Sequence, residues 1–280
     1  MRTSIQVCFA TIAATGIFGL CASDAGAQVQ WIEFHEAGLE SVARYAFAIA
    51  GIPDTDGDGM GDVVVGASEE DVLREDGTRC GGCGIAYVYS GSTGALRFTL
   101  APPGLPNGAH LGHSARGIPD VNGDGAGDIL VGSYIASTVW VFSGSDGALL
   151  DTLTGATAFG YSIGTIPDID RDGVTDFVVG AIYSSGYRGR AYVYSGATRT
   201  LLHEIFIPEL PSTSYFGWSV AGTDDLDGDG AGDVLIGAPE YRFSLVNGEL
   251  GRAFLFSGAT GTLLRTIDAP DFRRGSSGSK

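Results

Sequence analysis

A nine-residue pattern of acidic side chains occurs four times in this chain of 280 residues, and each copy is followed directly by an apolar run. Positions 1, 3, 5 and 9 are aspartate, except that the second copy has asparagine at position 3, and position 6 is always glycine. These residues are Asp54, Asp56, Asp58 and Asp62; Asp120, Asn122, Asp124 and Asp128; Asp168, Asp170, Asp172 and Asp176; Asp225, Asp227, Asp229 and Asp233. Alternate oxygen donors around a glycine bend suit a hard cation with about six to eight ligands.

Repulsion among these carboxylates indicates that each loop binds a cation. Two carboxylates about 4 Å apart repel by about 1 kcal/mol in bulk water and about 4 kcal/mol near a protein surface. Asp-Gly-rich loops are also good turns, which explains any single copy but not four copies in register. We therefore predict bound calcium, up to four ions with one per loop, and we expect the metal to contribute to folding.

The backbone carbonyl at position 7 is a further expected ligand in each loop. These carbonyls belong to Met60, Ala126, Val174 and Ala231. The second loop carries one charge fewer than the others because it has Asn122. We therefore expect its calcium site to be the weakest of the four.

The acidic loops are part of a longer repeat of four predicted strands. A Phe-Gly-x-Ser motif precedes each loop, clearest at 159–162 and 216–219 and degenerate at 45–48 and 111–114. The unbroken apolar run after each loop is typical of a strand covered on both faces. A third strand ending in a Ser-Gly turn and a short fourth strand follow. Four short antiparallel strands per copy, with no helix pattern, predict an all-β fold in which each copy is one blade of a β-propeller.

We predict blade 1 at 44–108, blade 2 at 109–157, blade 3 at 158–213 and blade 4 at 214–270, with a leading strand segment at 28–43 and a flexible tail at 271–280. The third Ser-Gly turn has Arg199 where the others have glycine, so we expect that turn to be built differently or to carry strain. Between the last aspartate of the loop and the Ser-Gly turn the copies differ, with 28, 15, 19 and 24 residues. The insertions therefore lie in one connection of the blade, and on repeat proteins such a face often binds partners.

Three motifs that recur together in fixed order resemble the FG-GAP repeats of integrin α-subunit propellers and their secreted bacterial relatives. They are the Phe-Gly-x-Ser motif, the Asp-x-Asp-x-Asp-Gly-x-x-Asp loop and a closing Gly-Ala at 66–67, 180–181 and 237–238. The resemblance covers about residues 44 to 266. It implies one calcium ion per matching loop and a seven-bladed ring as the usual closed form.

Four complete copies are fewer than such a ring contains, and three explanations stay open. The sequence is a fragment of a seven-bladed propeller, or its blades form a partial or open ring, or it assembles with other chains. An open arc exposes two blade faces. We therefore expect self-association through open blade edges as one possible outcome.

Residues 1–27 have the features of a secretory signal peptide. Arg2 precedes a mostly apolar stretch, and Ala25-Gly26-Ala27 suits a cleavage site. We predict that the protein is secreted, extracellular or periplasmic, with no transmembrane segment after the signal. The net charge of −17 disfavours a nucleic-acid partner, although calcium would neutralise the loop aspartates, which are fifteen of the 33 acidic residues.

Cys80 and Cys83 are the two cysteines outside the predicted signal peptide. In an oxidising compartment this spacing predicts a disulfide that clips a short loop. A redox pair would stand at a helix start and a zinc site would need two further soft ligands, and the sequence shows neither.

No set of residues in the sequence has the pattern of a catalytic centre, so we predict that the chain is not an enzyme. His110 and His113 form a His-x-x-His pair without a third ligand. His113 also fills the slot that the other copies give to Phe47, Tyr161 and Trp218, which favours a packing role. Loop aspartates held ionised by calcium are unsuited to act as general acids.

The sequence favours a secreted, calcium-binding, integrin-alpha-like β-propeller that binds an extracellular protein or glycan as an adhesion module. Tyr183, Tyr187, Tyr241 and Phe243 lie in the predicted insertions and are candidates for a ligand surface, whereas most aromatic residues are expected to pack between blades. The alternative is a non-catalytic accessory part of an extracellular polysaccharide- or lipid-active enzyme. A calcium module of the dockerin type is disfavoured, because its loops lead into helices.

Overall fold

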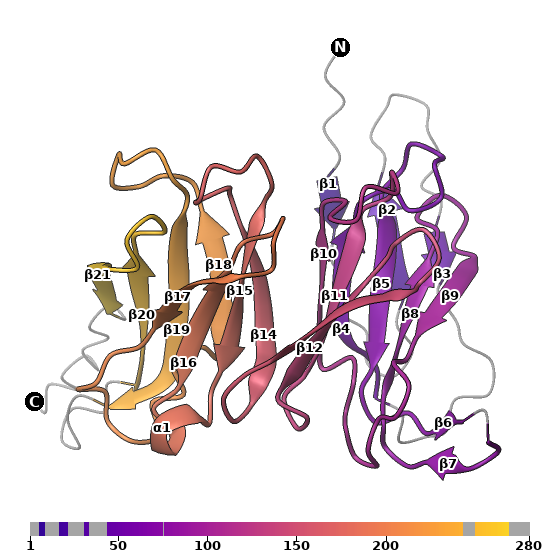
Figure 1. The fold of residues 1–280 in the computed structure, drawn as a ribbon, viewed down its shortest axis with the longest axis horizontal. Coiled ribbons are helices and arrows are strands. Elements are labelled where there is room, and N and C mark those ends of the chain that lie inside the picture. Colours follow the sequence, from indigo (N-terminus) through magenta and orange to yellow (C-terminus); the bar gives the residue numbers. More distant parts are fainter. Residues whose placement is uncertain are drawn as a thin grey trace, which may run out of the picture. The chain divides into compact units, whose positions relative to one another are not determined.

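The structure is a computed structural model that describes residues 6–8, 17–21, 31–33, 44–74, 76–242 and 250–268. Nearly all regular structure in these ranges is β-strand (Figure 1). The chain divides into two compact units, Met1–Thr154 and Gly155–Lys280. Each unit contains two four-stranded antiparallel sheets.

The sheets of the first unit are meanders, in which each strand pairs with the next strand of the same sheet. The first sheet has the order β4 (Tyr45–Ile52), β5 (Asp62–Ala67), β8 (Ile85–Tyr89) and β9 (Leu96–Leu100). The second has the order β10 (Ser114–Ile118), β11 (Asp128–Ser133), β12 (Thr138–Phe142) and β13 (Leu149–Thr154). A small hairpin of β6 (Val72–Leu73) and β7 (Arg79–Cys80) lies in the connection from β5 to β8.

The second unit repeats this topology. Its first sheet has the order β14 (Phe159–Ile166), β15 (Asp176–Ala181), β16 (Arg190–Tyr194) and β17 (Leu201–Ile205). Its second has the order β18 (Ser219–Thr223), β19 (Asp233–Arg242), β20 (Leu250–Phe256) and β21 (Leu263–Asp268). These sheets confirm the predicted all-β fold of four-stranded propeller blades. Their membership in a closed or an open ring stays a prediction, as do the blade limits.

A three-stranded sheet precedes the first blade. It has the order β1 (Gln6–Cys8), β2 (Ile17–Cys21) and β3 (Trp31–Glu33). The strand β3 lies within the predicted leading segment 28–43, and β1 and β2 lie within the predicted signal peptide 1–27. Removal of residues 1–27 stays a prediction, and the predicted tail at 271–280 lies outside the described residues.

The second strand of each blade is largely buried because its side chains are covered on both faces of the sheet. Every residue of β11 and β15 is buried. In the first unit, Val64 and Val88 of one sheet pack with Ile129, Val131 and Trp140 of the other. Each such side chain contributes about 1.5–3 kcal/mol when it is fully buried. The apolar run after each acidic loop therefore anchors that loop to the core.

The core of the second unit is built in the same way. Val178 and Val193 of its first sheet pack with Val234, Ile236 and Phe254 of its second sheet. The equivalent strands of the two units thus supply equivalent core residues.

Glycines let the two sheets of a unit approach closely. A Cβ atom on Gly66 would overlap the carbonyl oxygen of Gly112, and a Cβ on Gly180 would overlap that of Gly217. Gly66 and Gly180 belong to the closing Gly-Ala motif, whereas Gly112 and Gly217 belong to the Phe-Gly-x-Ser motif of the next blade. The two motifs therefore recur together because they contact each other across neighbouring blades.

Two local features refine the expectations from sequence. A four-residue turn, α1 (Ser184–Tyr187), lies between β15 and β16; Ser185 and Gly186 within it have φ of +54° and +69°, so it is not a regular right-handed helix. Arg199 has φ +59°, close to the +72°, +77° and +68° of Gly94, Gly147 and Gly261, so the third turn keeps the common shape and carries the strain. Within the described ranges, no helix has the length and apolar character needed to cross a membrane.

Candidate metal centres

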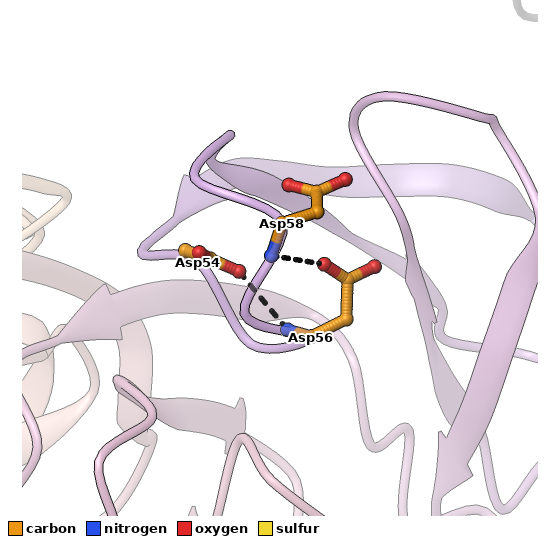
Figure 2. A group of neighbouring side chains, drawn as sticks. All are labelled: Asp54, Asp56 and Asp58. Atoms are coloured by element: carbon orange, nitrogen blue, oxygen red, sulfur yellow. Dashed lines mark hydrogen bonds between the residues drawn. The ribbon is translucent and has the colours of Figure 1, made fainter.

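The four acidic loops connect the first and second strands of their blades, as predicted. In each loop, three aspartates have carboxylate oxygens within 4.8 Å of one another. These trios are Asp54, Asp56 and Asp58; Asp120, Asp124 and Asp128; Asp168, Asp170 and Asp176; Asp225, Asp227 and Asp229. Among the described residues, all four acidic groups of this kind lie in the predicted loops. Figure 2 shows the first trio on its tight loop.

The aspartate at position 1 curls the loop around its own carboxylate. In the first loop, Gly57 and Gly59 donate their backbone N–H groups to Asp54 Oδ1 and Oδ2, both at 2.7 Å. The glycine at position 6 has φ between +84° and +91° in the four loops, a conformation that other residues adopt with strain. The hydrogen bond from the backbone N–H of this glycine is the main cause that lowers the pKa of Asp54. The same holds for Asp120 and Asp225. These carboxylates are thus held in the ionised form that a cation binds.

The aspartate at position 5 joins the loop to the Ser-Gly turn after the third strand. Ser143 donates its hydroxyl to Asp124 Oδ2 at 2.7 Å, and Ser195 donates to Asp172 Oδ2 at 3.0 Å. The backbone N–H of Ala126 is the main cause that lowers the pKa of Asp124, and the Ser143 hydroxyl adds to it. In the fourth loop Ser257 makes the same bond with Asp229. In the first loop the bond to Asp58 comes from Ser92, two residues after the serine of the Ser-Gly pair.

The aspartate at position 9 is buried and joins three segments. Asp176 Oδ2 accepts the N–H of Ile169 at 2.7 Å, and Oδ1 accepts the N–H of Gly196 at 2.8 Å. Burial raises the pKa of Asp176 to about 6, and these two hydrogen bonds oppose the shift. The same pair of bonds is made by Asp62, Asp128 and Asp233. This aspartate therefore has a structural role whether or not it also binds a metal.

The Ser-Gly turn was missed as part of the site in the sequence. A Cβ on its glycine would overlap the carbonyl oxygen of loop position 8, as for Gly144 against Gly127 and Gly196 against Thr175. The serine and the glycine are thus both needed because the turn lies directly against the loop. Their recurrence in register with the loop was the available signal.

The oxygen donors suit a calcium ion both in their chemistry and because they lie close together in each loop. The carboxylates are hard ligands, and their repulsion falls when a divalent cation lies among them. Asn122 donates its Nδ2 hydrogen to Asp124 Oδ2 at 2.8 Å and so replaces one charge of the second loop with a hydrogen bond. The predicted position-7 carbonyls and the order of the four affinities stay predictions.

An arginine of the fourth strand lies beside the carboxylates of the first loop. Arg97 in β9 has its Nη1 3.9 Å from Asp62 Oδ2 and its Nε 4.0 Å from Asp56 Oδ2. Arg97 also donates to the hydroxyl of Thr55 and to the carbonyl of Gly144, at 3.3 Å for the latter. At the corresponding position the other blades have Leu150, Leu202 and Leu264. A fixed positive charge from the fourth strand therefore lies beside two carboxylates of this loop. In the second unit, Arg171 of the third loop lies against the fourth loop, where its Nη2 donates to the carbonyl oxygen of Asp229 at 3.1 Å.

The histidine pair is surrounded by aromatic rings. The ring centroid of His113 lies 4.7 Å from that of Phe47 and 4.5 Å from that of Tyr134. Burial is the main cause that lowers the pKa of His113 to about 4, and the charges of His110 and Arg44 add to it. This environment supports the predicted packing role.

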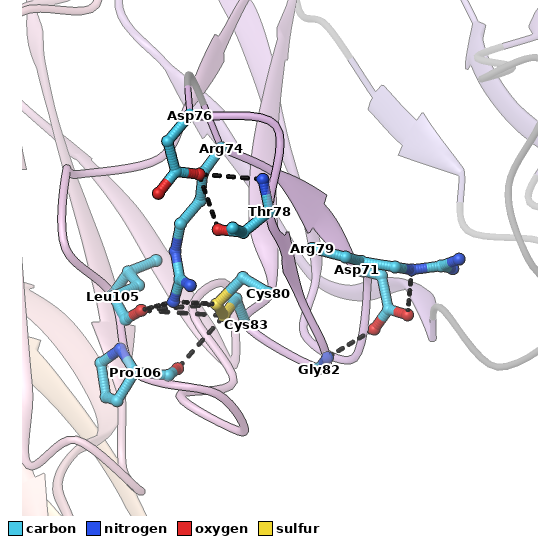
Figure 3. Close-up of a disulfide and its surroundings, with 10 residues drawn as sticks. All are labelled: Asp71, Arg74, Asp76, Thr78, Arg79, Cys80, Gly82, Cys83, Leu105 and Pro106. Atoms are coloured by element: carbon cyan, nitrogen blue, oxygen red, sulfur yellow. Dashed lines mark hydrogen bonds and ion pairs between the residues drawn. A yellow bond between two sulfur atoms is a disulfide. The ribbon is translucent and has the colours of Figure 1, made fainter.

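Cys80 and Cys83 form the predicted disulfide clip, with their Cα atoms 5.6 Å apart (Figure 3). Arg74 donates to the carbonyl oxygen of Leu105 at 2.6 Å beside the two sulfur atoms. Asp71 accepts the backbone N–H of Gly82 at 2.5 Å, which ties the ends of the same insertion together.

The predicted ligand-surface residues separate into different environments. Tyr183 and Tyr187 contact each other and are exposed. Tyr241 instead packs against Phe254, and the Arg252 guanidinium lies 4.4 Å from its ring centroid. Phe243 lies outside the described residues.

Comparisons with known proteins agree with the motifs. The family model of the FG-GAP repeat matches residues 159–194 and 216–256, in the third and fourth blades. The chain is 33% identical to integrin alpha-2 of Bos taurus over 115 residues, which are 38% of this chain and 9% of the relative. It is 35% identical to integrin alpha-E of Mus musculus over 102 residues, which are 35% of this chain and 8% of the relative. The matched region thus spans less than a tenth of the length of these relatives. The chain therefore contains FG-GAP repeats and is similar to integrin alpha subunits over part of its length.

Proposed function

We propose that the chain is a secreted, calcium-binding adhesion module that binds an extracellular protein or glycan and has no catalytic activity of its own. The observation that carries the calcium part is the fourfold convergence of carboxylate oxygens in loops that are hydrogen-bonded to the blade behind them. Such loops stiffen the blade when a cation offsets their repulsion. The similarity to integrin alpha subunits supports the binding role.

Calcium stoichiometry tests the metal part of this proposal. The chain stripped with EGTA is titrated with calcium by isothermal titration calorimetry, and about four ions per chain are expected. The double variant Asp170→Ala, Asp172→Ala removes two donors of the third loop and is expected to lose one ion. Glu209→Gln removes an exposed carboxylate outside the loops and the Ser-Gly turns and serves as the matched control, with an unchanged count. A stoichiometry near zero, or the same count in the loop variant, would contradict calcium binding.

Export is tested separately. The full gene product is expressed in a host with a secretory pathway, and the protein in the medium or periplasm is sequenced from its N-terminus. The expected first residue is Gln28. Retention of the chain inside the cell with residues 1–27 in place would contradict the proposed secretion without affecting the calcium result.

A further inference from the structure

Five aromatic side chains form a connected, largely exposed cluster in the second unit. We name Tyr161, Tyr183, Tyr187, Tyr215 and Trp218 the aromatic cluster. Ring centroids lie 5.2 Å apart for Tyr183 and Tyr187, 6.1 Å for Tyr187 and Tyr215, 6.0 Å for Tyr215 and Trp218, and 4.9 Å for Tyr161 and Trp218. The exposed fractions of Tyr187 and Trp218 are 50% and 43%. Large aromatic rings are thus presented to solvent at the connection between β15 and β16 and just before β18.

Backbone strain is concentrated beneath this cluster. Ser185, Tyr187, Thr213 and Tyr215 have φ of +54°, +65°, +72° and +52°. The positive φ of Tyr215 belongs to the repeat, because the residue before the Phe-Gly-x-Ser motif has positive φ in every blade. For a bulky residue such as tyrosine this conformation is unfavourable. Strain of this kind persists where surrounding contacts enforce it, and it gathers at binding and switch sites.

Hydrogen bonds hold the two strained segments against each other. Tyr215 donates its backbone N–H to the carbonyl of Tyr187 at 3.0 Å, and Phe216 donates to that of Arg188 at 2.9 Å. The Nε of Arg188 donates to the carbonyl of Leu210 at 2.9 Å. The backbone that carries Tyr187 and Tyr215 is therefore held in place before any ligand arrives, which lowers the entropy lost on binding.

The chemistry around the rings is polar but carries little free charge. Segments 183–187 and 211–219 contain serine, threonine, glycine and proline between the aromatic residues, and no acidic residue. Arg188 binds backbone carbonyls, and Arg190 donates to the hydroxyl of Ser185 and pairs with Glu204. Tyrosine, serine and glycine together form adaptable recognition surfaces in which rings supply contact area and hydroxyls supply hydrogen bonds.

We infer that the aromatic cluster binds an uncharged glycan. The apolar C–H face of a pyranose ring packs on an aromatic face, while its hydroxyl groups need neutral donors and acceptors such as the tyrosine and serine hydroxyls. A cationic ligand lacks an acidic partner in these segments, and an anionic ligand meets arginines that are already bonded within the protein. This inference names the ligand class of the proposed function. It rests on the proposed binding role and not on calcium binding or export.

Affinity electrophoresis of the calcium-loaded full chain tests the inference. The probes are three uncharged polysaccharides (laminarin, galactomannan and xyloglucan), two acidic ones (alginate and polygalacturonate), and casein as a protein probe. Retardation by at least one uncharged polysaccharide is expected. Tyr187→Ala and Trp218→Ala are expected to weaken the affinity for that polysaccharide at least tenfold. Tyr187→Phe keeps the ring and is expected to weaken the affinity less.

Phe206→Ala is the matched control, because Phe206 is an exposed aromatic residue of the same unit outside the cluster. It is expected to leave retardation unchanged, and the melting temperature of each variant, measured by circular dichroism, shows that the fold is kept. Retardation only by acidic polysaccharides or by casein, equal retardation of all variants, or none by any probe would overturn the inference. Those results say nothing against calcium binding, which the titration measures separately. If the titration shows no calcium binding but retardation persists and still depends on the cluster, only the metal part of the proposed function is overturned.

Discussion

The two ends of the four-stranded sheets differ in how much they vary. At the end that holds the acidic loops, all four blades bind the position-9 aspartate to the Ser-Gly turn with the same backbone hydrogen bonds. At the opposite end, the connections between second and third strands include a disulfide-clipped hairpin in the first blade and the strained turn α1 in the third. Uniform chemistry at one end stabilises the scaffold, and variation at the other is available for recognition.

Calcium removal should lower the stability of the protein more than any other change, and it acts only on the end of the sheets that holds the acidic loops. An ion at about 100 times its dissociation constant stabilises the folded state by about 2.7 kcal/mol per site. Several occupied loops together should therefore raise the melting temperature by at least about 10 °C. Differential scanning calorimetry in calcium and in EGTA measures the shift. An unchanged melting temperature would mean that the loops are turns and not metal sites, and the comparison between the two ends would fail.

Two glycines of the third blade sharpen the comparison, because one lies at each end. A Cβ on Gly196 would overlap the carbonyl oxygen of Thr175 and displace the N–H that binds Asp176, so Gly196→Ala should lower the free energy of unfolding by about 3 kcal/mol. Gly186 in α1 has φ +69° but no atom within 4 Å of its Cβ position, so Gly186→Ala should cost about 1 kcal/mol. Urea unfolding in calcium measures both. Equal costs would show that the uniform end is no more tightly built than the variable one.

His113 should make the variable end of the first unit sensitive to acid. Its pKa in the folded state is about 4, below the ordinary 6.5, so the unfolded chain binds this proton first as the pH falls. The free energy of unfolding should therefore decrease from pH 6.5 to pH 4, by at most about 1.4 kcal/mol per pH unit and by less where solvent screens the group.

The variant His113→Phe supplies the control for this pH dependence, because the corresponding residue of the first blade is Phe47. It keeps an aromatic ring against Tyr134 and removes the titrating group. Carboxylates titrate in both proteins, so the difference between their urea unfolding energies across the pH range isolates the histidine. Identical slopes would contradict the assignment.

Much of the architecture was predictable because it depends on local sequence patterns. The Asp-Gly spacing predicted each loop, and the β-branched runs predicted the buried strands β5, β11, β15 and β19. The recurrence of Phe-Gly-x-Ser and Gly-Ala predicted a repeat. Periodicity and turn chemistry act within about ten residues, which is why these features could be derived from the sequence alone.

Contacts between distant strands were not predictable in the same way. The bond from Ser195 to Asp172 depends on how β15 pairs with β16, and the approach of Arg97 to Asp62 spans 35 residues along the chain. The grouping of Tyr187 with Tyr215 depends on how two neighbouring sheets meet. Such contacts depend on strand register combined with the placement of whole sheets against each other, and reading each segment by itself does not give this combination.

The smallest effect expected concerns the difference between the first loop and the other three. Removing the charge of Arg97 in Arg97→Leu should tighten calcium binding at the first loop about fivefold, the equivalent of about 1 kcal/mol for a partly exposed pair near 4 Å. The reciprocal change Leu150→Arg should weaken the second loop by a similar factor. Calcium titrations followed through the amide resonances of Gly59 and Gly125 report the two loops separately. If Arg97→Leu leaves the Gly59 midpoint unchanged at low salt, Arg97 acts only through its hydrogen bonds to Thr55 and Gly144.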